Sequence, residues 1–135
     1  MAKKIRLDIV TPEKIVYSDD VNMVIARTTA GDIGVLPGHA ALVAGLVIWP
    51  LRLLTDDGET EVSLCGGFIE VLPEKVTILA HCAELPGDID VARAEAAKAR
   101  AENRLKGDRE GIDVSRAEAA LHRAMIRLQV AKHQQ

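Results

Sequence analysis

Apolar and polar residues alternate along this chain at two different periods, and the period changes near residue 87. In the N-terminal segment KIRLDIV, Ile5, Leu7 and Ile9 alternate with charged residues, and similar short runs follow it. A two-residue period places one face of a segment in a core and the other in solvent, as in a half-buried β-strand. After residue 87, apolar residues recur every three or four positions, which is typical of amphipathic helices.

Residues 1–87 are predicted to form an antiparallel β-sandwich or flattened barrel. Turn compositions such as TTAGDIG, LPGH, TDDGE and CGG separate its apolar runs, and the Asp57-Gly58 dipeptide is a typical hairpin signal. The chain contains only three aromatic residues, so Val, Ile, Leu and Ala must fill the core. The expected strands are residues 4–10, 21–28, 41–49, 51–55, 60–65, 67–72 and 75–82.

Residues 88–135 are predicted to form an antiparallel two-helix hairpin, with helices over about residues 89–106 and 113–132. Alanine and arginine dominate this part, and both favour helices. The fold class is therefore α+β in two parts, a sandwich followed by a helical hairpin. Each helix carries a narrow apolar seam, formed by Ala94, Ala97, Ala101 and Leu105 in the first and by Ala117, Leu121, Ala124 and Leu128 in the second.

Local signals place the ends of these helices. A Pro-Gly turn precedes the first helix, and Asp88 or Asp90 can cap it by accepting hydrogen bonds from its free amides. Gly107 is a typical helix stop, and Asp113 can cap the second helix. The six-residue linker KGDREG between them predicts that the helices lie side by side and antiparallel.

The two helical segments nearly repeat each other, since residues 89–105 and 112–128 agree at 12 of 17 positions. On a helix, the three repeated arginines lie within about 40° of one another, so each helix carries a basic stripe. When the hairpin closes, two stripes can flank one groove, and arginine's planar fork binds the phosphate oxygens of a nucleotide well. A solvated surface and a docking face for an acidic protein partner are alternative interpretations. The stripes are Arg93, Arg100 and Arg104, then Arg116, Arg123 and Arg127.

Charge and composition exclude several function classes. Residues 1–87 carry 7 Lys and Arg against 12 Asp and Glu, or −5, and residues 88–135 carry 10 against 8, or +2. This small basic excess and the scarcity of aromatic residues argue against a nucleic-acid partner. No apolar run approaches the roughly 20 residues of a membrane span, and no signal peptide is evident, so membrane association is expected only through a partner.

The cysteines and histidines indicate no chemistry of their own. Cys65 and Cys82 have neither the spacing of a zinc site nor the pattern of a disulfide framework, and two buried reduced thiols are expected. His39 follows a Pro-Gly turn with no nucleophile pattern near it, and His81 lies beside Cys82 in an expected strand. Turn and packing roles are expected for both histidines, so catalysis by this chain is not predicted.

Three motifs together resemble the epsilon-subunit family of the rotary F-type ATP synthases. The segment GDIGVLPGHAALV, residues 31–43, resembles the family's G.lGiLPGH.PLv, and CGGFIEV, residues 65–71, resembles SGGF.EV. The segment DIDVARAEA resembles the family's Ile-Asp-x-x-Arg-Ala nucleotide-binding motif. Two departures are local, with Ala41 in place of the usual proline and Cys65 in place of serine.

The resemblance implies a non-catalytic central-stalk subunit, peripheral to the cytoplasmic side of a bacterial inner membrane. Its sandwich would bind the gamma subunit and the c-ring and couple rotation to proton flow. Its hairpin would be a switch that either folds against the sandwich or extends among the alpha and beta subunits and blocks ATP hydrolysis. ATP, with or without magnesium, would be a regulatory ligand that stabilises the folded hairpin. The alternative is a free-standing adaptor whose hairpin binds a nucleotide or a protein.

The resemblance also implies particular site residues. The implied ATP contacts are Glu84, Ile89, Asp90, Arg93, Ala94, Arg100, Arg123 and Arg127. The implied partner contacts are Gly38, His39, Arg116, Arg123 and Arg127. No catalytic residue and no metal ligand is expected.

Overall fold

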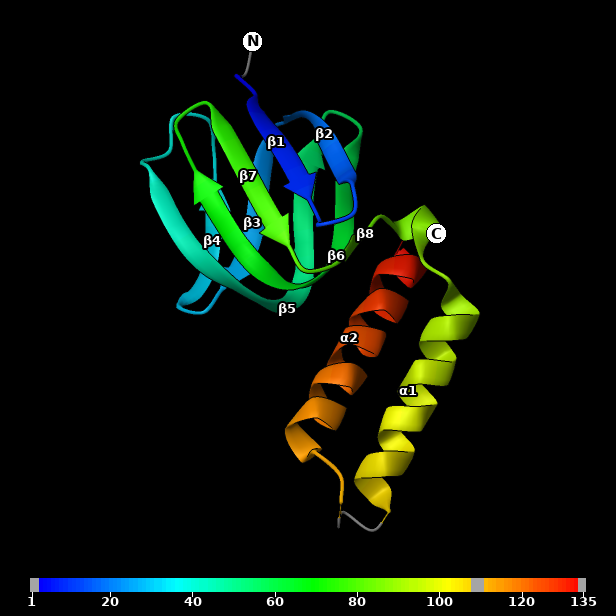
Figure 1. The fold of residues 1–135 in the computed structure, drawn as a ribbon. Coiled ribbons are helices and arrows are strands. Elements are labelled where there is room, and N and C mark those ends of the chain that lie inside the picture. The colour runs from blue at the N-terminus through cyan, green and yellow to red at the C-terminus, as the bar shows by residue number, and fades with distance from the viewer. Residues whose placement is uncertain (1–2, 108–110, 134–135) are drawn as a thin grey trace.

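A computed structural model describes residues 3–107 and 111–133 and contains a β-sandwich with a helical hairpin beside it (Figure 1). This arrangement confirms the predicted fold class. The strands are β1 (Ile5–Val10), β2 (Ile15–Val21), β3 (Met23–Thr28), β4 (Gly31–Val35), β5 (Leu42–Thr55), β6 (Gly58–Val71), β7 (Lys75–Ala80) and β8 (Ala83–Glu84).

The strands hydrogen-bond in the order β2-β1-β7-β6-β5-β3-β4, and β8 pairs with β6. All pairs are antiparallel except β1 with β7, which run parallel with Leu7 opposite Val76. The expectation of a purely antiparallel sandwich is therefore wrong at this pair. Parallel strands need a long crossover, and here most of the sandwich separates the two strands in sequence, so no local pattern reveals their pairing.

Two strands that the sequence pattern divides are continuous in the structure. β6 runs through the Cys-Gly-Gly segment, where Gly66 and Gly67 have φ of +102° and +137°, and its register with β5 continues without a shift. A Cβ at Gly67 would collide with the carbonyl oxygen of Leu79, so only glycine fits there. β5 runs through Pro50, which lacks an amide hydrogen and lies where β5 has no register partner in β3.

Three strands are missing from the sequence-based prediction. One is the two-residue β8, and the others are β2 and β4, which form the two edges of the sheet. β2 carries the adjacent carboxylates Asp19 and Asp20, and β4 consists largely of glycine and polar residues. Edge strands are commonly charged and short because this discourages pairing with other chains, and the same feature weakens their apolar alternation.

Aliphatic side chains fill the core of the sandwich, as predicted from the scarcity of aromatic residues. Ile5, Leu7, Ile9, Leu53 and Ile78 are among its completely buried members. One of the three aromatic residues packs against this core, a second against the hairpin and the third on the outer surface. They are Tyr17, Trp49 and Phe68, respectively.

A 3₁₀ turn (η1, Pro86–Asp88) connects the sandwich to helices α1 (Val91–Lys106) and α2 (Val114–His133). The Asp90 side chain caps α1 by accepting a 3.0 Å hydrogen bond from the Arg93 amide, and Asp113 accepts the equivalent bond from the Arg116 amide. These two caps are confirmed, and Gly107 ends α1 as expected. Residues 108–110 of the predicted linker lie outside the described residues. Neither described helix is both long and apolar enough to cross a membrane.

The helices pack on each other through the predicted alanine seam, with Ala94, Ala101, Ala117 and Ala124 buried. A second face of α2 packs against the sandwich through a small apolar group that the sequence did not reveal. We call it the docking cluster, and it contains Ile48, Trp49, Ile89, Ile126, Val130 and Ala131.

Candidate functional site

Polar contacts surround the docking cluster and attach the end of α2 to the sandwich. Arg127 Nε donates to Glu84 Oε1, and the two side chains are only 29% and 31% exposed. Farther along α2, His133 contacts Glu61. The Trp49 ring meets the His122 ring edge-on at 6.1 Å between centroids. The hairpin is therefore held by an ion pair, a histidine–carboxylate contact and one aromatic contact around a small apolar centre.

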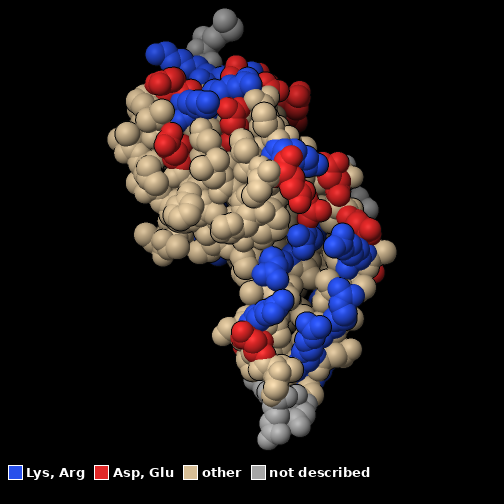
Figure 2. Space-filling view, in the orientation of Figure 1, with Lys and Arg blue, Asp and Glu red and all other residues tan. Residues whose placement is uncertain are grey.

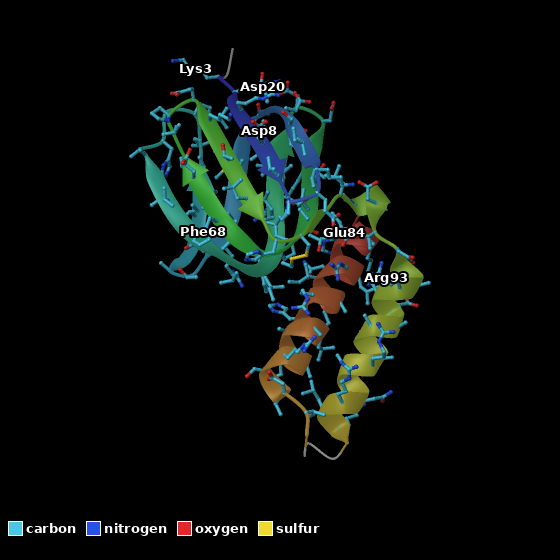
Figure 3. All side chains as sticks on the ribbon, in the orientation of Figure 1. Lys3, Asp8, Asp20, Phe68, Glu84 and Arg93 are labelled. Carbon is cyan, nitrogen blue, oxygen red and sulfur yellow. A yellow bond between two sulfur atoms is a disulfide. The ribbon has the colours of Figure 1, made fainter. Side chains whose placement is uncertain are left out.

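A cavity of about 250 Å³ opens where the two helices meet the sandwich. β8 contributes Glu84, the first three turns of α1 contribute Arg93 and Arg100, and α2 contributes Arg127. Figure 3 shows Glu84 and Arg93 on opposite sides of this junction. The complete lining is Glu84, Asp90, Arg93, Ala94, Ala97, Arg100 and Arg127.

The sequence brings these side chains together in three steps. The cap at Asp90 fixes the first turn of α1 beside β8. Spacings of four and three residues place Arg93, Ala97 and Arg100 on one face of that helix. Because α2 runs antiparallel, its C-terminal half returns to the sandwich and places Arg127 next to Arg93.

The cavity has an excess of positive charge, with three arginines against the two carboxylates of Glu84 and Asp90. Arg93 and Arg100 form no ion pair with any other residue in the described ranges, whereas Arg127 pairs with Glu84. Guanidinium groups that converge without a carboxylate partner are suited to bind phosphate oxygens. This arrangement can therefore hold a polyphosphate anion between the two helices and the sandwich.

A second cavity of about 420 Å³ adjoins the first and shares Glu84, Arg93 and Arg127 with it. It extends over the turn between β1 and β2, where Lys14 lies, and past Cys82. Lys14 and Ala97 are lining residues that the sequence analysis missed. The seam placed Ala97 between the helices, and no motif marks Lys14, which lies more than 65 residues before the helices.

The structure brings six of the eight implied ATP contacts to the first cavity, namely Glu84, Asp90, Arg93, Ala94, Arg100 and Arg127. Ile89 is instead buried in the docking cluster, where it packs near Ile126. Arg123 is half-buried on α2 and lines neither of the two cavities.

Five of the six stripe arginines line two separate cavities, one at each end of the hairpin. Figure 2 shows Lys and Arg side chains along both helices on one face. Arg104 and Arg116 meet at the far end, where they line a separate cavity with Asp113 and Ala117. These four are the repeat equivalents of Arg127, Arg93, Asp90 and Ala94, because the repeats are offset by 23 residues. Only the end near Asp90 lies against the sandwich.

Cys65 and Cys82 form a disulfide with their Cα atoms 5.4 Å apart, so the expectation of two reduced thiols is wrong. The tertiary pairing explains the error. Cys65 lies in β6 and Cys82 directly precedes β8, and the Cys65 amide donates to the Cys82 carbonyl over 3.1 Å. Neighbouring antiparallel strands bring the two side chains together although 17 positions separate them.

The implied partner contacts of the sandwich lie in the loop before β5. Gly38 has a φ of +87°, and its amide donates to the Pro73 carbonyl over 2.7 Å, which ties this loop to the turn between β6 and β7. The His39 amide donates back to the Leu36 carbonyl. Next to these turns, the outer surface of the sheet is apolar.

This outer apolar face is defined by Val43, Phe68 and Leu79, which are 68%, 57% and 56% exposed. Phe68 lies opposite Leu79 on one neighbouring strand and opposite Gly45 on the other, and Val43 is two residues from Gly45 on the same side of β5. The uncharged area on the sandwich in Figure 2 and the position of Phe68 in Figure 3 agree with this. Exposed apolar side chains grouped in this way typically mark a protein interface.

Among the described residues, no group of three or more His, Cys, Asp or Glu side chains is arranged to hold a metal ion.

Comparison with known proteins gives consistent results for both parts of the chain. Residues 4–86 match the family described as ATP synthase, delta/epsilon chain, beta-sandwich domain, and residues 88–132 match the corresponding long alpha-helix domain. The ATP synthase epsilon chain of Brevibacillus brevis is 55% identical over 130 residues, covering 96% of this chain and 98% of that one. The epsilon chain of Bacillus subtilis is 51% identical over 130 residues with the same coverage.

A solved structure has the same fold. It is a chain of the mitochondrial ATP synthase of Euglena gracilis, in an assembly of OSCP, F1 and the c-ring. That chain superposes with a TM-score of 0.78 at 25% identity, covering 96% of the present chain and 82% of its own length.

Proposed function

The chain belongs to the delta/epsilon chain family of the ATP synthases, and from this premise we propose that its hairpin is a switch that ATP holds in the docked state. Its relatives are ATP synthase epsilon chains, so the chain is a non-catalytic subunit of that complex. In the proposal the sandwich remains on the central stalk, and the hairpin either docks on it or extends and blocks ATP hydrolysis. The match of both parts to ATP synthase domains favours this function over a free-standing adaptor.

One observation carries the proposal, the convergence of Arg93, Arg127 and Glu84 from three different elements on one cavity. An anion that contacts both arginines beside Glu84 is bound only when the hairpin is closed and also docked. A ligand that binds one of two states shifts the population toward that state by its difference in affinity. ATP therefore favours the docked hairpin, and loss of ATP releases it.

The weak packing of the hairpin supports its role as the moving part. Five of its eight seam residues are alanines, which bury little apolar area per residue. Among the described residues, the docking cluster has only three buried members, Ile89, Ile126 and Val130. With so small a packing contribution, a bound nucleotide can decide which state is populated.

In the extended state, the basic side of α2 is proposed to meet acidic surfaces of the alpha and beta subunits. Arg116, Arg123 and Arg127 are the α2 arginines available for these contacts. Undocking separates Arg127 from Glu84, so its guanidinium then needs another carboxylate. Inhibition of hydrolysis would thus exchange an internal ion pair for contacts with a partner.

The sandwich is proposed to bind the gamma subunit and the c-ring and so to couple rotation to proton flow. Its outer apolar face and the adjoining loop with Gly38 and His39 are the surfaces suited to this contact. They lie away from the hairpin, so binding there leaves the helices free to move. Attachment through the c-ring would keep the chain at the cytoplasmic side of a bacterial inner membrane.

Isothermal titration with ATP and with ADP, each with and without magnesium, tests the nucleotide site. We expect the double variant Arg93→Ala and Arg127→Ala to weaken ATP binding by about 100-fold or more, because each charge-assisted contact contributes about 1.5–3 kcal/mol. The matched control is Arg104→Ala with Arg116→Ala, which removes the repeat-equivalent arginines at the other end. Equal affinity of both double variants would contradict the site.

Removal of residues 88–135 in the assembled ATP synthase tests the switch. We expect ATP synthesis and assembly to persist and ATP hydrolysis to rise, because the sandwich retains its own core while the blocking helices are absent. Unaltered hydrolysis by the truncated complex would show that the hairpin does not inhibit this enzyme.

A further inference from the structure

The Cys65–Cys82 disulfide lies at the point where the sandwich ends and the hairpin begins. β8 follows Cys82 directly and contains only two residues, which pair with Ser63 and Leu64 of β6. Glu84, the second of them, is the residue that pairs with Arg127. The disulfide therefore anchors the short strand that positions the carboxylate on which α2 docks.

The same disulfide also contacts α2 directly. A terminal nitrogen of Arg127 lies 3.6 Å from the Cys82 sulfur, within reach of a weak hydrogen bond to sulfur. Cys82 lines the second cavity, of about 420 Å³, together with His81, Asp88 and Arg93, so small thiols can reach it from solvent. Cys65 lies within the long strand β6 and is half-buried, as is Cys82.

From this placement we infer that Cys65 and Cys82 form a reversible thiol–disulfide site whose oxidation state sets how firmly the hairpin docks. This inference does not rest on nucleotide binding. The reactant is a dithiol reductant in one direction and a small-molecule disulfide in the other. When the two cysteines are oxidised, the disulfide holds β8 against β6 and favours docking. When they are reduced, only a few backbone hydrogen bonds hold β8 against β6.

A dithiol is the only reductant that this thiol–disulfide exchange needs, because it supplies both electrons and both protons. In the first step a thiolate of the reductant attacks the Cys82 sulfur, the Cys65–Cys82 bond breaks, and Cys65 leaves as a thiolate that takes a proton from water. In the second step the other thiol of the reductant, as a thiolate, attacks the reductant sulfur that is now bonded to Cys82. That bond breaks, and Cys82 leaves as a thiolate that is then protonated. The protein gains two electrons and two protons, and the reductant becomes a cyclic disulfide.

The charges around Cys82 permit this reaction. Arg127, which lies 3.6 Å from the Cys82 sulfur, can stabilise a departing thiolate, while Glu84 and Asp88 in the same cavity oppose it. Because Glu84 already pairs with Arg127, reduction and docking act on the same side chains. The two processes are therefore linked: docking shifts the thiol–disulfide equilibrium by the same factor by which oxidation shifts the docking equilibrium.

The test uses the full chain equilibrated in mixtures of reduced and oxidised dithiothreitol, without nucleotide. Thiols are counted by maleimide labelling and mass spectrometry, and docking is followed by hydrogen exchange of the peptides 83–90 and 124–133. We expect no labelled thiol in the oxidised chain and two in the reduced chain. Exchange of both peptides should be several-fold faster after reduction, while peptides from β1 and β7 remain unchanged.

Two variants and one control sharpen the result. The double variant Cys65→Ser and Cys82→Ser should exchange like the reduced chain and should not respond to dithiothreitol. Ile126→Ala weakens docking without changing a charge in the cavity, so by linkage it should be reduced at a lower dithiol ratio. Lys3→Gln, at an exposed position that Figure 3 shows at the end of the sandwich away from the hairpin, should behave like the unaltered chain.

Two labelled thiols in every redox mixture would overturn the inference, and so would equal exchange of the α2 peptide before and after reduction. If the double serine variant fails to fold, the comparison of oxidised and reduced chain still decides the question, because it needs no substitution. ATP titration of the oxidised chain is a separate measurement, so failure of the redox site and failure of the nucleotide site can be distinguished.

Discussion

The sandwich and the hairpin bury very different side chains. Among the described residues, eighteen buried ones form the core of the sandwich, and all but three of them are Val, Leu or Ile. The buried residues between the two helices are small alanines, and the hairpin docks through a cluster with three buried members. Since apolar stabilisation grows with the area removed from water, the sandwich is built to persist and the hairpin is built to open. Within one chain, side-chain size thus separates the scaffold from the moving part.

A second contrast lies within the hairpin, between its two nearly identical ends. At one end, Asp90 and Arg93 face Arg127 and Glu84 and lie against the sandwich. At the other, Asp113 and Arg116 face Arg104 without a sandwich residue beside them. The same local sequence therefore supplies a helix cap at both ends, but a cavity completed by a second domain at only one.

The largest effect is expected in the sandwich core. Leu53→Ala should lower the free energy of unfolding by about 2–5 kcal/mol, because it leaves a cavity at a fully buried site. The matched control Leu79→Ala, at a 56% exposed position, should change it by less than about 0.5 kcal/mol. Urea denaturation followed by circular dichroism measures both, and similar losses for the two variants would contradict the assignment of core and surface.

A smaller and local effect is expected at the docking ion pair. Arg127→Gln should weaken docking by about 1–2 kcal/mol, since a charge-assisted contact is lost at partly exposed side chains. Trp49, the only tryptophan, packs against His122 of α2, so its emission reports docking. The control Arg52→Gln removes an exposed pair with Glu59 and should have little effect. A matching fall in the stability of the sandwich would show that the two parts do not act separately.

The helix caps sharpen the comparison between the two ends. Asp90→Ala and Asp113→Ala should each destabilise their own helix by about 1 kcal/mol, because each removes an equivalent cap. Helicity measured by circular dichroism should fall similarly in both variants. Only Asp90→Ala should also weaken ATP binding in the titration proposed above. Equal ATP affinity of the two variants would mean that the ends are equivalent.

The smallest effect concerns acid stability of the sandwich. A hydrogen bond from Ser18, assisted by Lys75, lowers the pKa of Asp8 below its ordinary value of 3.8. A carboxyl whose pKa is lower in the folded state stabilises the protein above its unfolded pKa and loses this contribution as the pH falls through the folded pKa. Asp8→Asn should therefore reduce stability at pH 7 by less than about 1 kcal/mol and leave it nearly unchanged near pH 2.

Thermal unfolding of both proteins across this pH range measures the difference. A stability gap that persists unchanged at low pH would show that Asp8 acts through packing rather than through its charge.

Local patterns in the sequence were sufficient for the two-part organisation. The two-residue period of the sandwich and the three-to-four-residue period of the helices depend only on which face of each element is buried. The caps at Asp90 and Asp113 are equally local, because each carboxylate bonds an amide three residues later. The resemblance to the family further named six residues that the structure brings to one cavity.

The long-range pairings were decided only in the tertiary structure. The parallel contact between β1 and β7, the Cys65–Cys82 disulfide and the docking of Val130 join segments whose sequence gives no sign of their partner. Lys14 and Arg127 reach neighbouring cavities for the same reason. A local period reports which side of a segment is buried, but not what covers it; that depends on how the whole chain folds back on itself.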